Sequence, residues 1–160
     1  MVEGRIQRGF NGSAGGFAHS RAITGPGPAR PCHCGADDCF ETRGSLWGMQ
    51  RELERRGQDR RLDPPGVDSA LIADAALHLG IGMANMAKVL GPPGQVVVGF
   101  APEAALGMFA EQTKDAFLNQ YSHANTPPPI FDASIADPVA LARGAACSVL
   151  AGLFTASPTG

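Results

Sequence analysis

Apolar and small residues in the second half of the chain follow patterns that predict a long helix and then a strand. Residues 68–90 place apolar side chains at the 3.6-residue spacing of one helix face. Gly80, Gly82 and Ala84 interrupt this helix with small residues, which favours close approach of another backbone. Residues 95–99 form the run Gln-Val-Val-Val-Gly without alternation, as expected of a strand that is buried on both faces.

The segments after this strand continue the alternation of strands and helices. Residues 102–120 are expected to form a second helix, and residues 130–135 a second short strand. An Ala-rich helix is expected over residues 139–154, with Cys147 as a buried small residue on it. This order of elements predicts an α/β fold.

The first half of the chain is richer in glycine and charge and predicts less regular structure. A short strand is expected around Ile6, a glycine-rich loop over residues 11–16, and a helix that begins near Phe40 and runs to Met49. Residues 51–61 are dense in charge. We interpret them as a solvated helix face rather than a phosphate-binding patch, because acidic residues are interleaved with the arginines.

Length and charge argue against several classes of function. The chain has 160 residues, enough for one domain with a core, and a net charge of −2. That charge gives no reason to expect binding to nucleic acid or to an anionic membrane. No apolar run is expected to span a bilayer, and residues 1–5 lack the apolar stretch of a signal peptide. A cytoplasmic location is therefore expected.

The most specific pattern is a cluster of residue types that bind metals: His19, Cys32, Cys34 and Cys39. Thiolate and imidazole suit a tetrahedral Zn²⁺ ion, and four such ligands leave no position for water, so the expected site is structural. The alternative is a disulfide plus a loose thiol, which a reduced cytosol disfavours. His33 is a competing fourth ligand, but it lies between two ligands in the sequence and is expected to point away from the metal.

Around these residues the chain resembles the ROK family (repressors, open reading frames and sugar kinases). Residues 14–19 resemble the family's E-x-G-H segment, and residues 32–41 resemble its C-x-C-G-x2-G-C-x-E segment. Three later segments resemble the family's glycine-containing helix, the strand after it and the closing helix. These are residues 79–86, 90–99 and 143–146.

The resemblance implies the C-terminal lobe of an actin-like, RNase H-like sugar-kinase fold, in which a zinc-binding loop braces the sugar side. It implies that His19 binds both zinc and a sugar hydroxyl, and that Glu41 contacts the sugar. The chain is accordingly expected to be one ROK C-terminal domain over residues 1–157. Within it we expect a zinc and sugar-side loop over residues 11–41 and an α/β portion over residues 62–157.

Several positions depart from the family's pattern. Gly16 replaces the first Glu of the E-x-G-H segment and offers no carboxylate to a sugar hydroxyl. Asp38 replaces the second Gly of the cysteine segment, and Phe100 replaces one of a glycine pair, where it is expected to hinder backbone approach to a nucleotide. The family's Asp-x-Gly-x-Thr phosphate loop and the Asn-Asp pair that carries its catalytic base are not in the chain. No residue of the chain is therefore expected to be catalytic.

These features favour the interpretation that the chain is the effector domain of a sugar-responsive ROK transcriptional regulator. This domain is expected to be braced by zinc and to lack catalytic activity. The alternatives are the C-terminal part of an ATP-dependent, glucokinase-like sugar kinase and an inactive structural remnant. The chain is expected to be the C-terminal half of a longer protein. ATP and Mg²⁺ would bind only with the missing lobe, and DNA only through an absent domain. The expected partners are a weakly bound sugar or sugar phosphate, and a second copy of the chain or the missing lobe, without a membrane.

Overall fold

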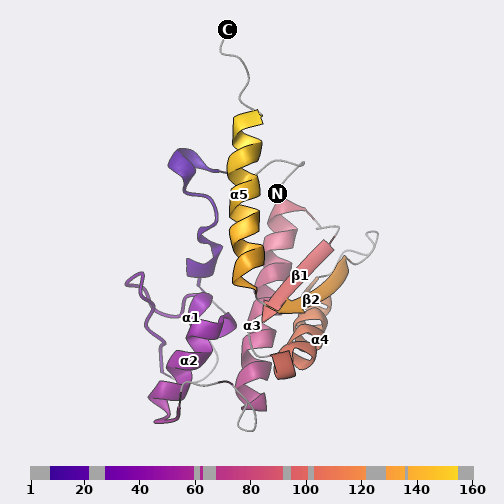
Figure 1. Ribbon diagram of the computed structural model, residues 1–160. Helices are drawn as coiled ribbons and strands as arrows, with labels where there is room; N and C mark the ends of the chain where they lie inside the picture. Colours follow the sequence, from indigo (N-terminus) through magenta and orange to yellow (C-terminus); the bar gives the residue numbers. More distant parts are fainter. Residues whose placement is uncertain are drawn as a thin grey trace.

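A computed structural model describes residues 8–21, 28–59, 62, 68–91, 95–100, 103–121, 129–135 and 137–154. The elements follow in the order η1 (Phe10–Gly12), η2 (Gly16–His19), α1 (Glu41–Gly44), α2 (Leu46–Arg55), α3 (Ser69–Leu90), β1 (Gln95–Phe100), α4 (Glu103–Gln120), β2 (Ile130–Ile135) and α5 (Pro138–Phe154) (Figure 1). The short 3₁₀ helices η1 and η2 flank residues 13–15, which form a loop as expected, and they take in residues 11, 12 and 16 of the expected loop. The strand expected around Ile6 lies outside the described residues.

Strands β1 and β2 form a parallel pair, with Gln95 opposite Ile130 at one end and Phe100 opposite Ile135 at the other. Helix α4 connects the two strands and packs on both of them, which makes a β-α-β unit. The α/β order is confirmed, and β2 has the predicted bounds. The side chains of β1 lie outside the described part, so its burial on both faces stays a prediction.

Helix α3 is the central element, because it packs against α4 on one side and α1 on another (Figure 1). The Asp68 carboxylate caps its N-terminus by accepting hydrogen bonds from the amides of Ala70 and Leu71 at 3.0 and 3.1 Å. At Gly80 a Cβ atom would collide with the carbonyl oxygen of Thr113 on α4. The close backbone approach predicted from the small residues of this helix is confirmed at that crossing.

The length and composition of α3 would also allow it to cross a membrane, contrary to the expectation from the sequence. Half of its apolar window is buried within the protein. The buried His78 ring lies on this helix, with Nδ1 2.7 Å from the carbonyl oxygen of Asp74. Packing of α3 between α1 and α4 accounts for its apolar character without a membrane.

The helix predicted to begin near Phe40 is broken into α1 and α2 at Ser45. The Ser45 hydroxyl accepts a hydrogen bond from the Gly48 amide at 3.0 Å and thereby caps α2. A Cβ atom at Gly48 would collide with the Glu41 carbonyl, so the two short helices meet closely. The Phe40 ring lies directly against Gly82 of α3, where a side chain would displace it. These contacts fix α1, and the loop before it, on the central helix.

Helix α5 forms as predicted, but the expected burial of Cys147 is wrong because this thiol is exposed. Val149 and Leu150 on the same helix are also exposed, at 66% and 51%. None of the other described elements packs extensively on α5, so nothing in the described part of the chain covers this apolar surface.

Candidate metal centre

The loop that precedes α1 holds two cysteines side by side. Pro31 and Asp37 form an isolated antiparallel bridge, and the Cys32 amide donates a hydrogen bond to the Ala36 carbonyl at 2.9 Å. The Gly35 amide donates back to the Cys32 carbonyl at 3.0 Å, and its φ of +91° is one that glycine adopts without strain. The backbone reversal predicted at Gly35 is confirmed.

Other backbone contacts bring His19 to this loop. Arg21 and Cys39 form an isolated antiparallel bridge, and the Phe40 amide donates to the Ser20 carbonyl at 2.8 Å. The Cys39 thiol lies 3.5 Å from the His19 carbonyl oxygen, to which it donates. His19, the last residue of η2, is thus placed beside cysteines that follow it by 13 and 20 positions.

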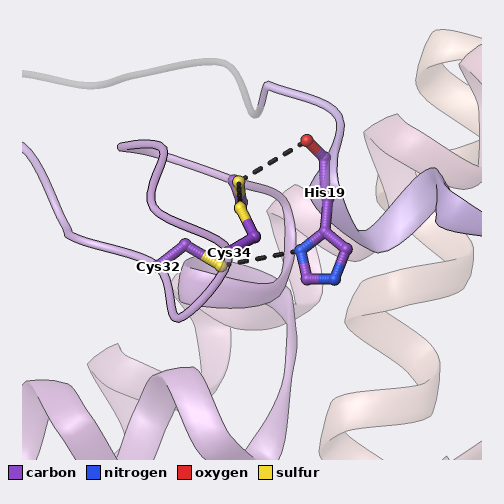
Figure 2. A group of neighbouring side chains, drawn as sticks. His19, Cys32 and Cys34 are labelled. Carbon is purple, nitrogen blue, oxygen red and sulfur yellow. Dashed lines mark hydrogen bonds between the residues drawn. The ribbon is translucent and has the colours of Figure 1, made fainter.

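The four expected ligand atoms are close enough to share one tetrahedral ion. The His19 Nδ1 atom is 3.6 Å from the Cys32 sulfur, and the sulfurs of Cys34 and Cys39 are 3.5 Å apart. All four atoms lie within 4.8 Å of one another. The bond lengths of tetrahedral zinc separate two thiolate sulfurs by about 3.8 Å, and a sulfur from an imidazole nitrogen by about 3.5 Å. The donor set therefore fits zinc, and Figure 2 shows the His19 ring facing the Cys32 sulfur.

The thiols of this cluster lie in contrasting environments. Cys39 is 1% exposed, and burial raises its pKa to about 12. Cys34 is exposed, and hydrogen bonds with the Ala36 backbone and then with the Cys39 side chain lower its pKa. A thiolate at the buried Cys39 needs a cation beside it, and a divalent metal supplies that charge. All four cysteines of the chain, each in the described part, are free thiols.

Two further donor groups, His33 and Glu41, lie against this cluster. The His33 Nε2 atom is 3.4 Å from the Glu41 Oε2 atom, and the His19 Nδ1 atom is 3.7 Å from the same oxygen. The edge of the His33 ring meets the Trp47 ring, with centroids 5.2 Å apart. His33 is not among the four clustered ligands His19, Cys32, Cys34 and Cys39, and the expectation that it points away from their metal stays a prediction. Packing against Trp47, which the local sequence did not suggest, directs the imidazole toward Glu41.

The aspartate that replaces the motif's second glycine anchors the loop. Asp38 has a φ of +54°, in the left-handed region that glycine favours and that aspartate tolerates better than most residues. Its buried carboxylate accepts hydrogen bonds from the Arg30 amide at 3.1 Å and from the Arg43 guanidinium at 3.2 Å. The side chain thus compensates for a backbone conformation that is less favourable than it would be for glycine.

Arg30 ties the cysteine loop to three helices. Its guanidinium donates to the Thr42 carbonyl and to the Asp74 carboxylate, both at 3.3 Å, and its Nε atom lies 3.6 Å from Glu52. Burial, followed by the repulsion from Arg43, lowers the pKa of Arg30. Sequence reasoning missed this contact because Arg30 and Asp74 are 44 positions apart.

The charged segment that begins at residue 51 is only partly solvated. Glu52 on α2 is 3% exposed, whereas the guanidinium groups of Arg55 and Arg56 that bind its carboxylate are partly exposed. Hydrogen bonds from Arg55, followed by those from Arg56, lower the pKa of Glu52 to about 2 against the cost of burial. Our interpretation of residues 51–61 as a solvated face is therefore wrong for Glu52, which belongs to the interior side of α2.

A cavity of about 400 Å³ opens beside the cysteine loop, next to α2. Its lining combines an aromatic ring, several guanidinium groups and three residues of the loop. These include Arg30, Cys32, His33, Trp47, Arg51 and Arg55. The Arg51 guanidinium lies over the Trp47 ring, 5.6 Å from its centroid.

The sequence pattern of the ROK family matches residues 1–150. The chain belongs to the ROK family. The resemblance found in the cysteine loop and the later segments is thereby confirmed. The glucokinase of Halalkalibacterium halodurans is 32% identical in an alignment of 122 residues that covers 62% of this chain and 36% of the glucokinase.

Solved structures of ROK proteins share the fold. The ROK hexokinase of Thermus thermophilus matches with a TM-score of 0.66 and 26% identity, over 91% of this chain and 50% of the hexokinase. A Streptomyces griseus ROK glucokinase, solved with glucose and AMPPNP, matches with a TM-score of 0.59 and 19% identity over 81% of this chain and 49% of its own. A ROK transcriptional regulator, a homologue of the E. coli MLC protein, matches with a TM-score of 0.61 and 17% identity, over 81% of this chain and 37% of the regulator. The chain spans half or less of each relative.

Proposed function

We propose that the chain is the sugar-sensing part of a ROK-family transcriptional regulator, braced by one structural zinc ion and without catalytic residues of its own. The observation that carries this proposal is the set of four zinc-type ligands beside Glu41, with a glycine at position 16. A regulator must bind its sugar without transforming it. Loss of the motif's first carboxylate therefore harms a regulator less than a kinase.

Zinc would be held by His19, Cys32, Cys34 and Cys39, and it would supply a closed four-coordinate anchor without a bound water. The loop that these residues share carries Glu41 at its end, as the first residue of α1. A carboxylate fixed at this point is a strong acceptor for a sugar hydroxyl. The proposed role of the metal is to hold that acceptor in place.

The motif's first carboxylate is missing at Gly16. A Cβ atom at Gly16 would meet nothing within 4 Å, so a longer side chain could begin there without a clash at Cβ. Each lost hydrogen bond costs about 0.5–1.5 kcal/mol. We expect free sugars to bind this chain in the millimolar range or more weakly, which corresponds to about 4 kcal/mol of binding free energy.

The second candidate is the C-terminal part of an ATP-dependent sugar kinase, and the 32% identity with a glucokinase favours it. In that case ATP and Mg²⁺ would bind only with the lobe that carries the phosphate loop. The coding sequence upstream of Met1 separates the two candidates. A helix-turn-helix there supports the regulator, which would contact DNA through that domain, and an Asp-x-Gly-x-Thr segment alone supports the kinase.

We propose a cytoplasmic location, because a site with three metal-binding thiolates needs a compartment that keeps thiols reduced. A second copy of the chain, or the part of its longer relatives that this chain does not match, is the proposed protein partner.

Metal analysis of the purified, untagged chain tests the zinc assignment. We expect about one zinc per chain, little zinc in Cys32→Ser, and an unchanged content in the control Cys147→Ser, whose thiol is exposed on α5. Removal of the metal should expose residues 11–41 to proteolysis first, because the ligands lie on loops. A folded wild-type chain without zinc would refute the proposal.

A further inference from the structure

A second group of donor atoms shares two members, His19 and Cys32, with the expected zinc cluster. The Glu41 Oε2 atom lies 3.4 Å from His33 Nε2, 3.7 Å from His19 Nδ1 and 3.8 Å from the Cys32 sulfur. The edge between His19 and Cys32, at 3.6 Å, belongs to both groups. All ligand atoms of this second group again lie within 4.8 Å of one another. Tetrahedral zinc bound by oxygen, nitrogen and one sulfur has edges of about 3.3–3.6 Å, so this group is close to the size of a zinc site.

The geometry of the second group is fixed by packing. The His33 ring is held between two rings, with its centroid 5.2 Å from those of both His19 and Trp47. Glu41 is the first residue of α1. The backbone of α1 lies in close contact with Gly48 of α2, which holds it in place. His33 and Glu41 therefore face the shared edge without a rearrangement of the loop.

The two groups cannot each hold their own ion, because one imidazole nitrogen, His19 Nδ1, is common to both. While all cysteines are reduced, the group with three thiolates is preferred, since zinc favours soft sulfur ligands. We propose that His19, Cys32, His33 and Glu41 are a second coordination set for the same zinc ion, which holds it when Cys34 and Cys39 are oxidised to a disulfide.

The oxidation involves the two thiols that only the first set uses. Their sulfurs are 3.5 Å apart, and a disulfide closes this distance to about 2.0 Å. Cys34 is exposed, so a peroxide can reach it. The Cys34 thiolate attacks one peroxide oxygen and breaks the O–O bond, which gives a sulfenic acid and, with one proton from solvent, water. The Cys39 thiolate then attacks that sulfur, and the oxygen leaves as a second water with another solvent proton. Two thiolates lose two electrons, and one hydrogen peroxide becomes two waters.

The shift of the ion would alter the sugar side of the site, a consequence that rests on the function proposed above. A Glu41 carboxylate that binds zinc through Oε2 gives that oxygen and part of its negative charge to the metal, so it becomes a weaker acceptor for a sugar hydroxyl. Oxidation of the pair Cys34 and Cys39 would therefore weaken sugar binding while the metal stays in place. The site would report the redox state of the compartment as well as its sugar.

The experiment follows the metal in the 160-residue chain before and after treatment with hydrogen peroxide. Three variants are compared with wild type: His33→Ala, Glu41→Gln and the control Glu111→Gln, an exposed acid on α4. Reduced, all four proteins should hold about one zinc. After oxidation, wild type and Glu111→Gln should keep it, whereas His33→Ala and Glu41→Gln should lose it. In cobalt-loaded wild type, the thiolate-to-metal charge-transfer band should fall from three-thiolate to one-thiolate intensity.

A second measurement avoids oxidation. Cys34→Ser with Cys39→Ser should still bind zinc. Adding His33→Ala should weaken that binding by about tenfold or more, since even the loss of an outer-shell partner typically costs this much. Equal zinc affinity with and without His33→Ala, or loss of zinc from oxidised wild type, would overturn the proposal. A failure to form the 34–39 disulfide, as shown by mass spectrometry of peptides, would overturn it as well. Absence of zinc from the reduced wild type would instead refute the structural zinc proposed above.

Discussion

Replacement of Glu52 by Gln should destabilise the chain at neutral pH. The Glu52 carboxylate receives hydrogen bonds from Arg55 at 2.9 and 2.7 Å and from Arg56 at 2.7 Å, and Arg30 lies 3.6 Å away. Gln keeps the size of the side chain but removes the charge. The side chain of Arg30 is 16% exposed, and among the described residues its guanidinium then keeps Asp74 as its one carboxylate partner within 4 Å.

The magnitude follows from the pKa of Glu52. A carboxyl group whose pKa falls from 4.5 to about 2 on folding contributes at most about 3 kcal/mol at neutral pH. The arginines that lower this pKa are partly solvated, since the side chain of Arg55 is 54% exposed, and solvent screens their attraction. We therefore expect a loss of about 1–3 kcal/mol from a total stability of about 5–15 kcal/mol.

The pH dependence distinguishes this charge effect from a packing defect. Because the folded pKa is depressed, the contribution of Glu52 is complete above about pH 4.5 and disappears as the pH falls toward 2. Urea unfolding followed by the fluorescence of Trp47, the one tryptophan of the chain, measures both proteins across this range. The stability gap between wild type and Glu52→Gln should close toward pH 2.

The control is Glu54→Gln on the same helix, which removes a partly exposed ion pair with Arg51 and should cost less than about 1 kcal/mol. A gap between wild type and Glu52→Gln that stays constant from pH 7 to pH 2 would show that the carboxylate charge does not stabilise the fold.

Three further predictions concern packing, ligand binding and association. Gly80→Ala should destabilise the fold by about 1–3 kcal/mol, because the new Cβ meets the backbone of α4 at Thr113. The control Gly107→Ala, whose Cβ would meet nothing within 4 Å, should stabilise the fold by up to about 1 kcal/mol, and urea unfolding measures both. Gly16→Glu should strengthen glucose binding in calorimetric titration if the sugar-side loop is formed, and an affinity equal to wild type would count against the site. The chain should self-associate in light scattering, because α5 exposes Val149 and other apolar residues, and a monomer at high concentration would contradict this.

Patterns of short range were sufficient for much of the secondary structure. The spacing of residues 68–90 predicted α3, and the small residues within it predicted the close crossing that Gly80 makes with α4. The order of β1, α4, β2 and α5 was also predictable from the sequence. These features depend on periodicity and on local backbone preferences, which neighbouring residues along the chain determine.

The turn of the cysteine loop could be predicted for the same reason, because Gly35 allows the chain reversal that places Cys32 and Cys34 together. The tertiary structure decided the rest of the site. His33 faces Glu41 and packs against the Trp47 ring of α2, a contact that links two separate elements.

The ion pairs that hold this loop were equally hidden from the sequence. Arg30 meets Asp74 and Glu52 because three separate helices converge around one guanidinium, and Glu52 is buried although it lies in a segment that is dense in charge. Cys147, in contrast, lies exposed on a helix whose composition predicted burial. Burial and ion pairing depend on which surfaces the folded chain brings together, and a local sequence pattern does not determine these contacts.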